Sequence, residues 1–238
     1  MGRGVQADYA LCAMRLLCVS DIHGHLDALA AVLATAERRS FHKLIVAGDV
    51  VFPGPEPLET WRRLMTARAV LVQGLSDKAL ATLDPTEIRA KNEHERQRLD
   101  RMRSVRAELG DIILERLKRL PTHVRFPLED GRELLLVHGS PVDPGEALTS
   151  DMTDAEMMAL IGDDPADVVV CGMSHVPFER QLDDVHIINV GSIGEAPRHD
   201  GGGPRVAHAT WIETSALGLT VEAIVVPLNE LVRARSMG

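Results

Sequence analysis

Aspartate and histidine residues stand directly after several strand-like apolar runs of this sequence. In chain order these side chains are Asp21, His23, Asp49, His138 and His175, which follow the runs 16–20, 44–47, 134–137 and 168–171. Because the carboxyl ends of parallel strands meet at one crevice of an α/β sheet, we expect the five side chains to converge. Carboxylates combined with imidazoles, without thiolates, suit manganese, iron or zinc. The sequence therefore predicts a divalent-metal site.

A metal ion in such a site has a defined chemistry. It lowers the pKa of a bound water toward neutrality and withdraws charge from a phosphoryl oxygen. Glycines stand beside or close to the candidate ligands, where they let the backbone turn sharply and approach an ion; they are Gly24, Gly48, Gly74, Gly139 and Gly172. The pattern favours hydrolysis at a metal centre.

Alternating strand-like and helix-like segments must position these residues. The segments 16–19, 44–47 and 69–72 read as strands, and 26–36 and 58–65 read as helices. This rhythm predicts a largely parallel sheet covered by helices. The second half has one helix near 154–161 and more strands, which are expected at 134–137, 168–171, 185–190, 206–212 and 220–226. We predict an α/β fold of two face-to-face sheets with helices outside, the second sheet partly antiparallel.

A charged stretch separates the two halves. Asp84 and Pro85 predict the start of a helical stretch that runs to Leu120, where Pro121 ends it. Between positions 89 and 119 the sequence has ten Arg or Lys and six Asp or Glu. Two interpretations stay open: a solvated helical face, or a basic collar for substrate phosphates.

Composition limits the class of protein. The 238 residues, 45% of them hydrophobic, suffice for one core, so we expect an N-terminal tail at 1–13 and a single domain at 14–238. Neither a signal peptide nor a membrane span is expected. The net charge of −9 argues against a broad nucleic-acid surface. Three widely spaced cysteines predict free thiols, which indicate a soluble cytoplasmic protein.

Five short blocks, taken in order, resemble the signature of the calcineurin-like metallophosphoesterases. That signature is D-x-H, G-D, G-N-[HC]-[DE], a lone His before Gly, and G-H-x-H, and the blocks here are SDIHGH, AGDVV, QGLSD, VHGS and CGMSH. The segments MSHVP and NVGSIGEAPRHDGGGPR are similar to those of the small bacterial and archaeal phosphodiesterases of the family. The resemblance implies a four-layered αββα sandwich. It also implies a metal-dependent phosphodiesterase or phosphatase that acts on a small phosphate ester.

The resemblance further implies a ligand set with a degenerate second site. The first metal would be held by Asp21, His23 and His175, with Asp49 bridging to a second metal held also by His138. Two further ligands of the second metal, an Asn and a His in the family, are here Leu75 and Met173, which suit a hard or borderline ion poorly. Manganese is the expected metal, with iron or zinc as alternatives. We expect one ion at the first site, and weak binding or none at the second.

Catalytic and phosphate-binding positions follow from the same resemblance. Ser76 occupies the position at which many relatives have a His that helps to protonate the leaving group, and close relatives often have a Cys. A serine hydroxyl is a poor general acid. Asp77, which orients that His in relatives, is present here. Phosphate contacts are expected from Asn189, Ser192 and Arg198, through a backbone nest and a forked guanidinium.

Three readings of the degenerate site stay open. The first is a phosphoesterase with one metal, or a weak second one, and reduced activity. In the second, His25 or His199 supplies a substitute ligand or acid. In the third, the chain is a catalytically weak or inactive binding or scaffold protein with a protein partner, as the retromer subunit of this family is.

Overall fold

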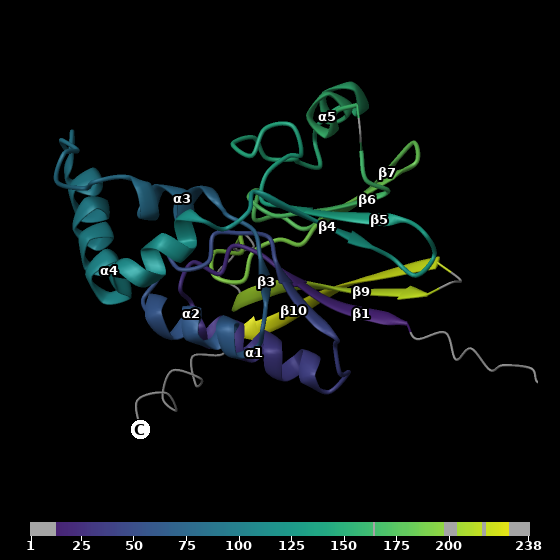
Figure 1. The fold of residues 1–238 in the computed structure, drawn as a ribbon, viewed down its shortest axis with the longest axis horizontal. Coiled ribbons are helices and arrows are strands. Elements are labelled where there is room, and N and C mark those ends of the chain that lie inside the picture. Colours follow the sequence, from purple (N-terminus) through teal and green to yellow (C-terminus); the bar gives the residue numbers. More distant parts are fainter. Residues whose placement is uncertain (1–12, 164, 198–203, 216–217, 229–238) are drawn as a thin grey trace, which may run out of the picture.

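The computed structural model describes residues 13–163, 165–197, 204–215 and 218–228. Two five-stranded sheets pack face to face, and helices cover their outer faces (Figure 1). This arrangement confirms the predicted αββα sandwich. The expected tail at 1–13 lies almost wholly outside the described residues.

The first sheet combines the start and the end of the described chain. Its strands, in spatial order, are β10 (Gly218–Leu228), β9 (Arg205–Ser215), β1 (Met14–Val19), β2 (Lys43–Val46) and β3 (Val70–Leu71). β1, β2 and β3 are parallel as predicted, whereas β9 runs antiparallel to both β1 and β10. The sequence analysis had placed β9 and β10 in the second sheet. Their long hairpin instead pairs with β1 and extends the first sheet.

The second sheet is also mixed. Its strands, in spatial order, are β4 (His123–Pro127), β5 (Glu133–Val137), β6 (Val168–Cys171), β8 (Val185–Asn189) and β7 (Phe178–Leu182). The three central strands are parallel, and the two edge strands are antiparallel to their neighbours. The edge strands β4 and β7 were not predicted, because their exposed, mixed sequences lack a continuous apolar run.

Helices form the outer layers and one end of the molecule. They are α1 (Leu26–Glu37), α2 (Pro57–Thr66), α3 (Leu75–Thr82), α4 (Glu93–Lys118) and α5 (Asp154–Ile161). Figure 1 shows α1 and α2 beneath the first sheet, α5 above the second, and α3 with α4 beyond one end of both sheets. No helix in the described part of the chain is long and apolar enough to cross a membrane.

Alternating side chains of the strands build separate core layers. Leu17 and Val19 of β1 face the helices of the first sheet, whereas Leu16 and Cys18 face the second sheet. Successive side chains of a strand point to opposite faces, so a strand buried on both faces reads as one continuous apolar run. This burial fixes the strands whose carboxyl ends carry the candidate ligands.

The charged stretch differs from the prediction of one helix starting at Asp84. The Asp84 carboxylate accepts hydrogen bonds from the backbone and the hydroxyl of Thr86, which form a local turn. The long helix α4 begins only at Glu93, where the Asn92 side chain caps it by accepting from the Glu95 N–H. α4 is also interrupted at Gly110, whose φ of 70° is not helical.

The basic side chains of α4 have structural partners in several places. Arg96, Arg103 and Arg119 form ion pairs within the helix. Arg101 donates to the backbone oxygens of Pro53 and Gly54, and thereby holds α4 against the loop that follows Asp49. These contacts favour the reading of a solvated and packed helical face over a phosphate collar.

Candidate metal centre

The loops after four strands of the two sheets meet at one end of the sandwich. The backbone N–H groups of Asp21 and His23 donate to the oxygens of Gly48 (3.1 Å) and Asp49 (2.9 Å), which joins the first two loops. The N–H of Gly172 donates to the oxygen of His138 at 3.0 Å and joins the other two. The five predicted ligands are thereby brought together from separate parts of the chain.

Three of the five form a first ligand group. Asp21 Oδ1 lies 3.2 Å from His175 Nε2 and 3.7 Å from His23 Nε2, and the two imidazole nitrogens are 3.3 Å apart. Ligand atoms that bind one ion at about 2.0–2.2 Å must lie about 3–4 Å from one another. The first group, Asp21 with His23 and His175, therefore has the spacing that a single divalent ion requires.

A second ligand group lies beside the first and shares Asp21 with it. It consists of Asp21, Asp49 and His138, all of them buried. Asp49 Oδ1 lies 3.5 Å from His138 Nε2, while its Oδ2 lies 3.9 Å from His23 Nε2. The Asp49 carboxylate thus stands between the two groups, one oxygen toward each.

The buried imidazoles are oriented by their second ring nitrogens. His23 Nδ1 and His138 Nδ1 each lie 2.6 Å from a backbone carbonyl oxygen, that of Phe52 and that of Ala47. A carbonyl only accepts, so each Nδ1 carries a proton, and in the neutral imidazole Nε2 is then the acceptor. Within the described chain, His138 Nε2 is buried without a hydrogen-bond partner. Such an orphaned acceptor fits a metal ligand.

The two carboxylates are oriented by backbone N–H groups. Asp21 Oδ2 accepts from Met173 N–H at 2.9 Å, and Asp49 Oδ1 accepts from Ser76 N–H at 2.8 Å. Burial by itself would raise the pKa of Asp21, but the contact with His175 and the nearby imidazoles lower it overall. The same contact with Asp21 raises the pKa of His175. Asp21 is thus held as a carboxylate facing the imidazoles.

The loops that carry the ligands use uncommon backbone conformations. Positive φ values of 51° to 67° occur at Asp21, His23, Asp49, Met173 and His175. Side chains on such a backbone point where an ordinary strand or helix would not send them. The predicted close approach of glycine backbone is also present: a Cβ on Gly74 would lie 2.1 Å from Asp49 Oδ1.

Ser76 and Asp77 occupy the first turn of α3 but face different ways. Ser76 Oγ is buried and has no hydrogen-bond partner among the described residues. Both oxygens of Asp77 accept backbone N–H groups, those of Val50 and Gly74, at 3.0 Å. Burial, and then the Asp49 carboxylate, raise the pKa of Asp77. These contacts give Asp77 a positioning role for the loop of Asp49 and the start of α3.

The predicted phosphate contacts at Asn189 and Ser192 are occupied by the protein itself. Asn189 Nδ2 donates to the oxygen of Gly172 at 2.7 Å, and Asn189 Oδ1 accepts from the N–H of Gly191. Ser192 Oγ donates to the oxygen of Asp21 at 2.9 Å. Both side chains are buried and connect the strand ends to one another. The expected roles of Arg198 and His199 lie outside the described residues.

Neither the residues at the two missing ligand positions nor the candidate substitute His25 joins the ligand groups among the described residues. The side chain of Leu75 is exposed at the start of α3, and Met173 contributes its backbone N–H. The candidate substitute ligand His25 precedes α1 and belongs to neither group among the described residues. Burial, followed by the charge of Arg205, lowers the pKa of His25.

One acidic residue at the centre was missed by the sequence analysis. Glu195 Oε2 lies 3.7 Å from His23 Nε2 and 4.0 Å from His175 Nδ1. It stands in the loop after β8, between Gly194 and Ala196. The signal available in the sequence was its place, six positions after the end of β8, a central parallel strand.

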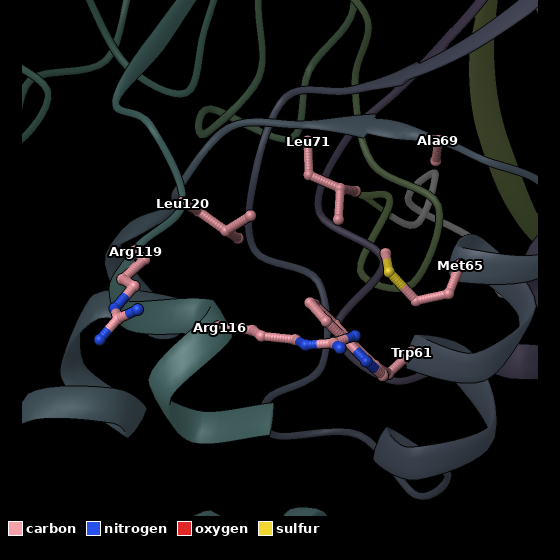
Figure 2. Close-up of a pocket in the computed structure, with 7 residues that line it drawn as sticks. All are labelled: Trp61, Met65, Ala69, Leu71, Arg116, Arg119 and Leu120. Atoms are coloured by element: carbon pink, nitrogen blue, oxygen red, sulfur yellow. The ribbon is translucent and has the colours of Figure 1, made fainter. Parts of the chain in front are cut away.

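A cavity of about 320 Å³ lies elsewhere, between α2, β3 and the end of α4 (Figure 2). Its walls are mainly apolar side chains, including Trp61 and Leu71, with Arg116 and Arg119 at its border. None of its lining residues belongs to the ligand groups, so the chemistry of the centre does not extend into it.

Together, the fold and the centre define an α/β protein in which two adjacent groups of Asp and His side chains, at the carboxyl ends of the strands, have the spacing to hold divalent ions. A sequence model of the calcineurin-like phosphoesterase superfamily domain matches residues 14–210, and the chain belongs to this superfamily.

Individual proteins are similar to this chain in sequence or in fold. An uncharacterized protein of Methanocaldococcus jannaschii is 26% identical over 194 residues, which are 74% of this chain and 75% of that protein. A hypothetical protein of Pyrococcus horikoshii has a similar structure, with a TM-score of 0.75, 20% identity and coverage of 94% of this chain and 92% of the other. A metallophosphoesterase from Sphaerobacter thermophilus gives a TM-score of 0.68, 24% identity and coverage of 93% and 97%. At these identities the two structures support the fold.

Proposed function

We propose that the chain is a metal-dependent phosphoesterase, a phosphodiesterase or phosphatase, that hydrolyses a small phosphate ester. The observation that carries this proposal is the convergence of two carboxylates and three imidazoles, of which His23 and His138 are buried and oriented through Nδ1 by backbone carbonyls. Asp21, His23 and His175 would hold a first ion, and Asp49 and His138 a second, weaker one. When bound, the ion supplies an activated water and charge stabilisation at a phosphoryl oxygen.

The protein itself prepares the site for such a substrate. Backbone N–H groups of Met173 and Ser76 fix the two carboxylates, so little reorganisation is needed during a reaction. The Ser76 hydroxyl, at the position where relatives have a His or Cys, is buried and has no hydrogen-bond partner among the described residues. Because a serine hydroxyl is a poor general acid, reduced activity is part of the proposal.

Manganese is the proposed ion, with iron and zinc as alternatives, because the donors are oxygen and imidazole nitrogen. The buried free thiols of Cys18 and Cys171 support a reducing, cytoplasmic location.

Hydrolysis of bis-p-nitrophenyl phosphate tests the proposal. We expect Mn²⁺-dependent turnover in the wild type, loss of turnover in Asp49→Asn, and wild-type turnover in Asp111→Asn, a change on the exposed face of α4. Absence of turnover with Mn, Fe, Zn, Co and Ni would contradict it. Bound metal without turnover would favour a binding or scaffold protein with a protein partner.

A further inference from the structure

The carboxylate of Glu195 is not among the ligands that the resemblance to the family assigns to the centre. Its oxygen lies 3.7 Å from His23 Nε2, the atom that faces the first ligand group. Among the described residues, its ion-pair partners are His23 and His175 and include no Lys or Arg. An anion that faces imidazole nitrogens gains most when a cation stands between them.

The loop of Glu195 is tied directly to the loop of Asp21. The N–H of Glu195 donates to Ser192 Oγ at 2.8 Å, and this hydroxyl donates to the oxygen of Asp21 at 2.9 Å. The N–H of Gly194 donates to the same oxygen at 2.9 Å. Glu195 is therefore held in register with a ligand of the first group.

Close packing at Gly194 strengthens this connection. A Cβ at that position would lie 2.4 Å from His25 Cδ2 and 2.4 Å from the oxygen of Ile22. No side chain fits between the two loops, so their backbones approach closely. The Glu195 side chain, 40% exposed, starts from this fixed base and comes within 3.7 Å of His23 Nε2 and 4.0 Å of His175 Nδ1, beside the first group but not within it.

We infer that Glu195 is a further carboxylate ligand of the ion held by Asp21, His23 and His175. The inference rests on the proposed function, because it concerns the same ion. It raises the donor set of the first position to two carboxylates and two imidazoles, with the Asp49 carboxylate beside them. Additional carboxylate oxygen favours Mn²⁺ relative to Zn²⁺, which imidazole suits better. Glu195 thereby adds to the affinity of the first position and to its preference for manganese.

Metal binding to the metal-free protein tests this role without reference to turnover. The free Mn²⁺ signal in electron paramagnetic resonance gives the Kd of each variant directly, and a competing chelator gives the Kd for Zn²⁺. We expect Glu195→Gln to weaken Mn²⁺ binding at the tighter position by about tenfold or more, and Zn²⁺ binding by less. Glu195→Asp, which keeps the charge on a shorter side chain, is expected to lie between Glu195→Gln and the wild type. Glu146→Gln, an exposed change in the loop after β5, should match the wild type.

The outcomes separate the two proposals. If the wild type binds Mn²⁺ and Glu195→Gln binds it equally well, the assignment of Glu195 is overturned while the proposed function stands. If the wild type binds none of the tested ions, the proposed metal centre fails and the role of Glu195 fails with it. Thermal unfolding of the metal-free variants should match the wild type, since the carboxylate is partly exposed.

Discussion

The two ligand groups share Asp21 but lie in different surroundings. In the first group the His175 side chain is 25% exposed, and the neighbouring Glu195 side chain is 40% exposed. In the second group the side chains of His138 and Asp49 are 1% and 10% exposed. The first group therefore has a partly exposed imidazole, whereas the second is buried throughout.

The second group shows how a loop can keep its shape when the residue at a ligand position is not a ligand. Met173 and Leu75 stand where the family places ligands of a second metal. Nevertheless, the Met173 N–H still holds Asp21, and the Ser76 N–H next to Leu75 still holds Asp49. The loop geometry depends on backbone hydrogen bonds that do not require those two side chains. We therefore expect the first position to bind its ion more tightly than the second.

The largest expected effect comes from removing one imidazole from each group in turn. His23→Ala should abolish the tighter metal equivalent and lower kcat/KM by about 100-fold or more, about 2.7 kcal/mol in the barrier. His138→Ala should remove only the weaker equivalent and lower kcat/KM by about tenfold. Elemental analysis measures the metal content of each variant, and the diester assay measures its kcat/KM.

His94→Ala, at an exposed position of α4, is the control for this pair. Equal losses in His23→Ala and His138→Ala would mean that the two positions act as one unit, and the comparison between them would fail.

A gain of function tests the same comparison from the other side. Met173→His would add an imidazole at the depleted second position, on a backbone whose φ of 67° histidine tolerates better than most residues. We expect a second metal equivalent per chain and a rise in diester hydrolysis of about tenfold, near 1.4 kcal/mol. Unchanged metal content, measured by elemental analysis, would show that the second position lacks more than this ligand.

An effect on stability rather than on turnover is expected from crowding the second group alone. A Cβ added by Gly74→Ala would lie 2.1 Å from Asp49 Oδ1 and 2.2 Å from the Asp49 nitrogen, so the backbone must shift. We expect a loss of about 1–3 kcal/mol in the free energy of unfolding of the metal-free protein, measured with urea. Gly145→Ala, whose Cβ would meet Asp143 Oδ1 at 3.2 Å, should change it by less than about 0.5 kcal/mol. Equal stabilities would contradict the packing argument.

The smallest effect concerns a thiol beneath the first group. Burial, and then the nearby Asp21 carboxylate, raise the pKa of Cys171 to about 12, so the thiol stays protonated at pH 8. We expect no reaction of native Cys171 with a thiol reagent at pH 8, with or without metal, as followed by mass spectrometry of digested protein. If the labelling of Cys171 changed when metal was added, the carboxyl end of β6 would have to move on metal binding.

Much of the fold could be predicted because buried elements leave strong patterns in the sequence. The apolar runs of β5 and β6 and the capped segment of α5 fall close to their predicted positions. The convergence of the ligands followed from strand order alone, since parallel strands place their carboxyl ends at one edge. In contrast, the return of β9 to the first sheet depends on pairing across nearly 200 positions, which no local pattern encodes.

Side-chain roles were harder to predict than positions. Asp77 reads from the motif as a catalytic partner, yet both its oxygens are used by backbone N–H groups. Glu195 lies in an irregular loop, where only three-dimensional contacts with the loop of Asp21 reveal its neighbours. The start of α4 was misplaced because the turn at Asp84 uses the same residue types as a helix cap.

The left-handed backbone conformation in the ligand loops makes the stability of the folded protein, and so its lifetime in the cell, depend on metal supply. Each non-glycine residue in that region costs about 1–2 kcal/mol, and Asp21, His23, Asp49, Met173 and His175 all adopt it. An ion that binds only the folded chain would offset this cost by about 2.7 kcal/mol at a hundred times its Kd. In a cell short of the ion, unloaded copies would unfold more often and be degraded first. The abundance of the protein would then follow the concentration of its own metal.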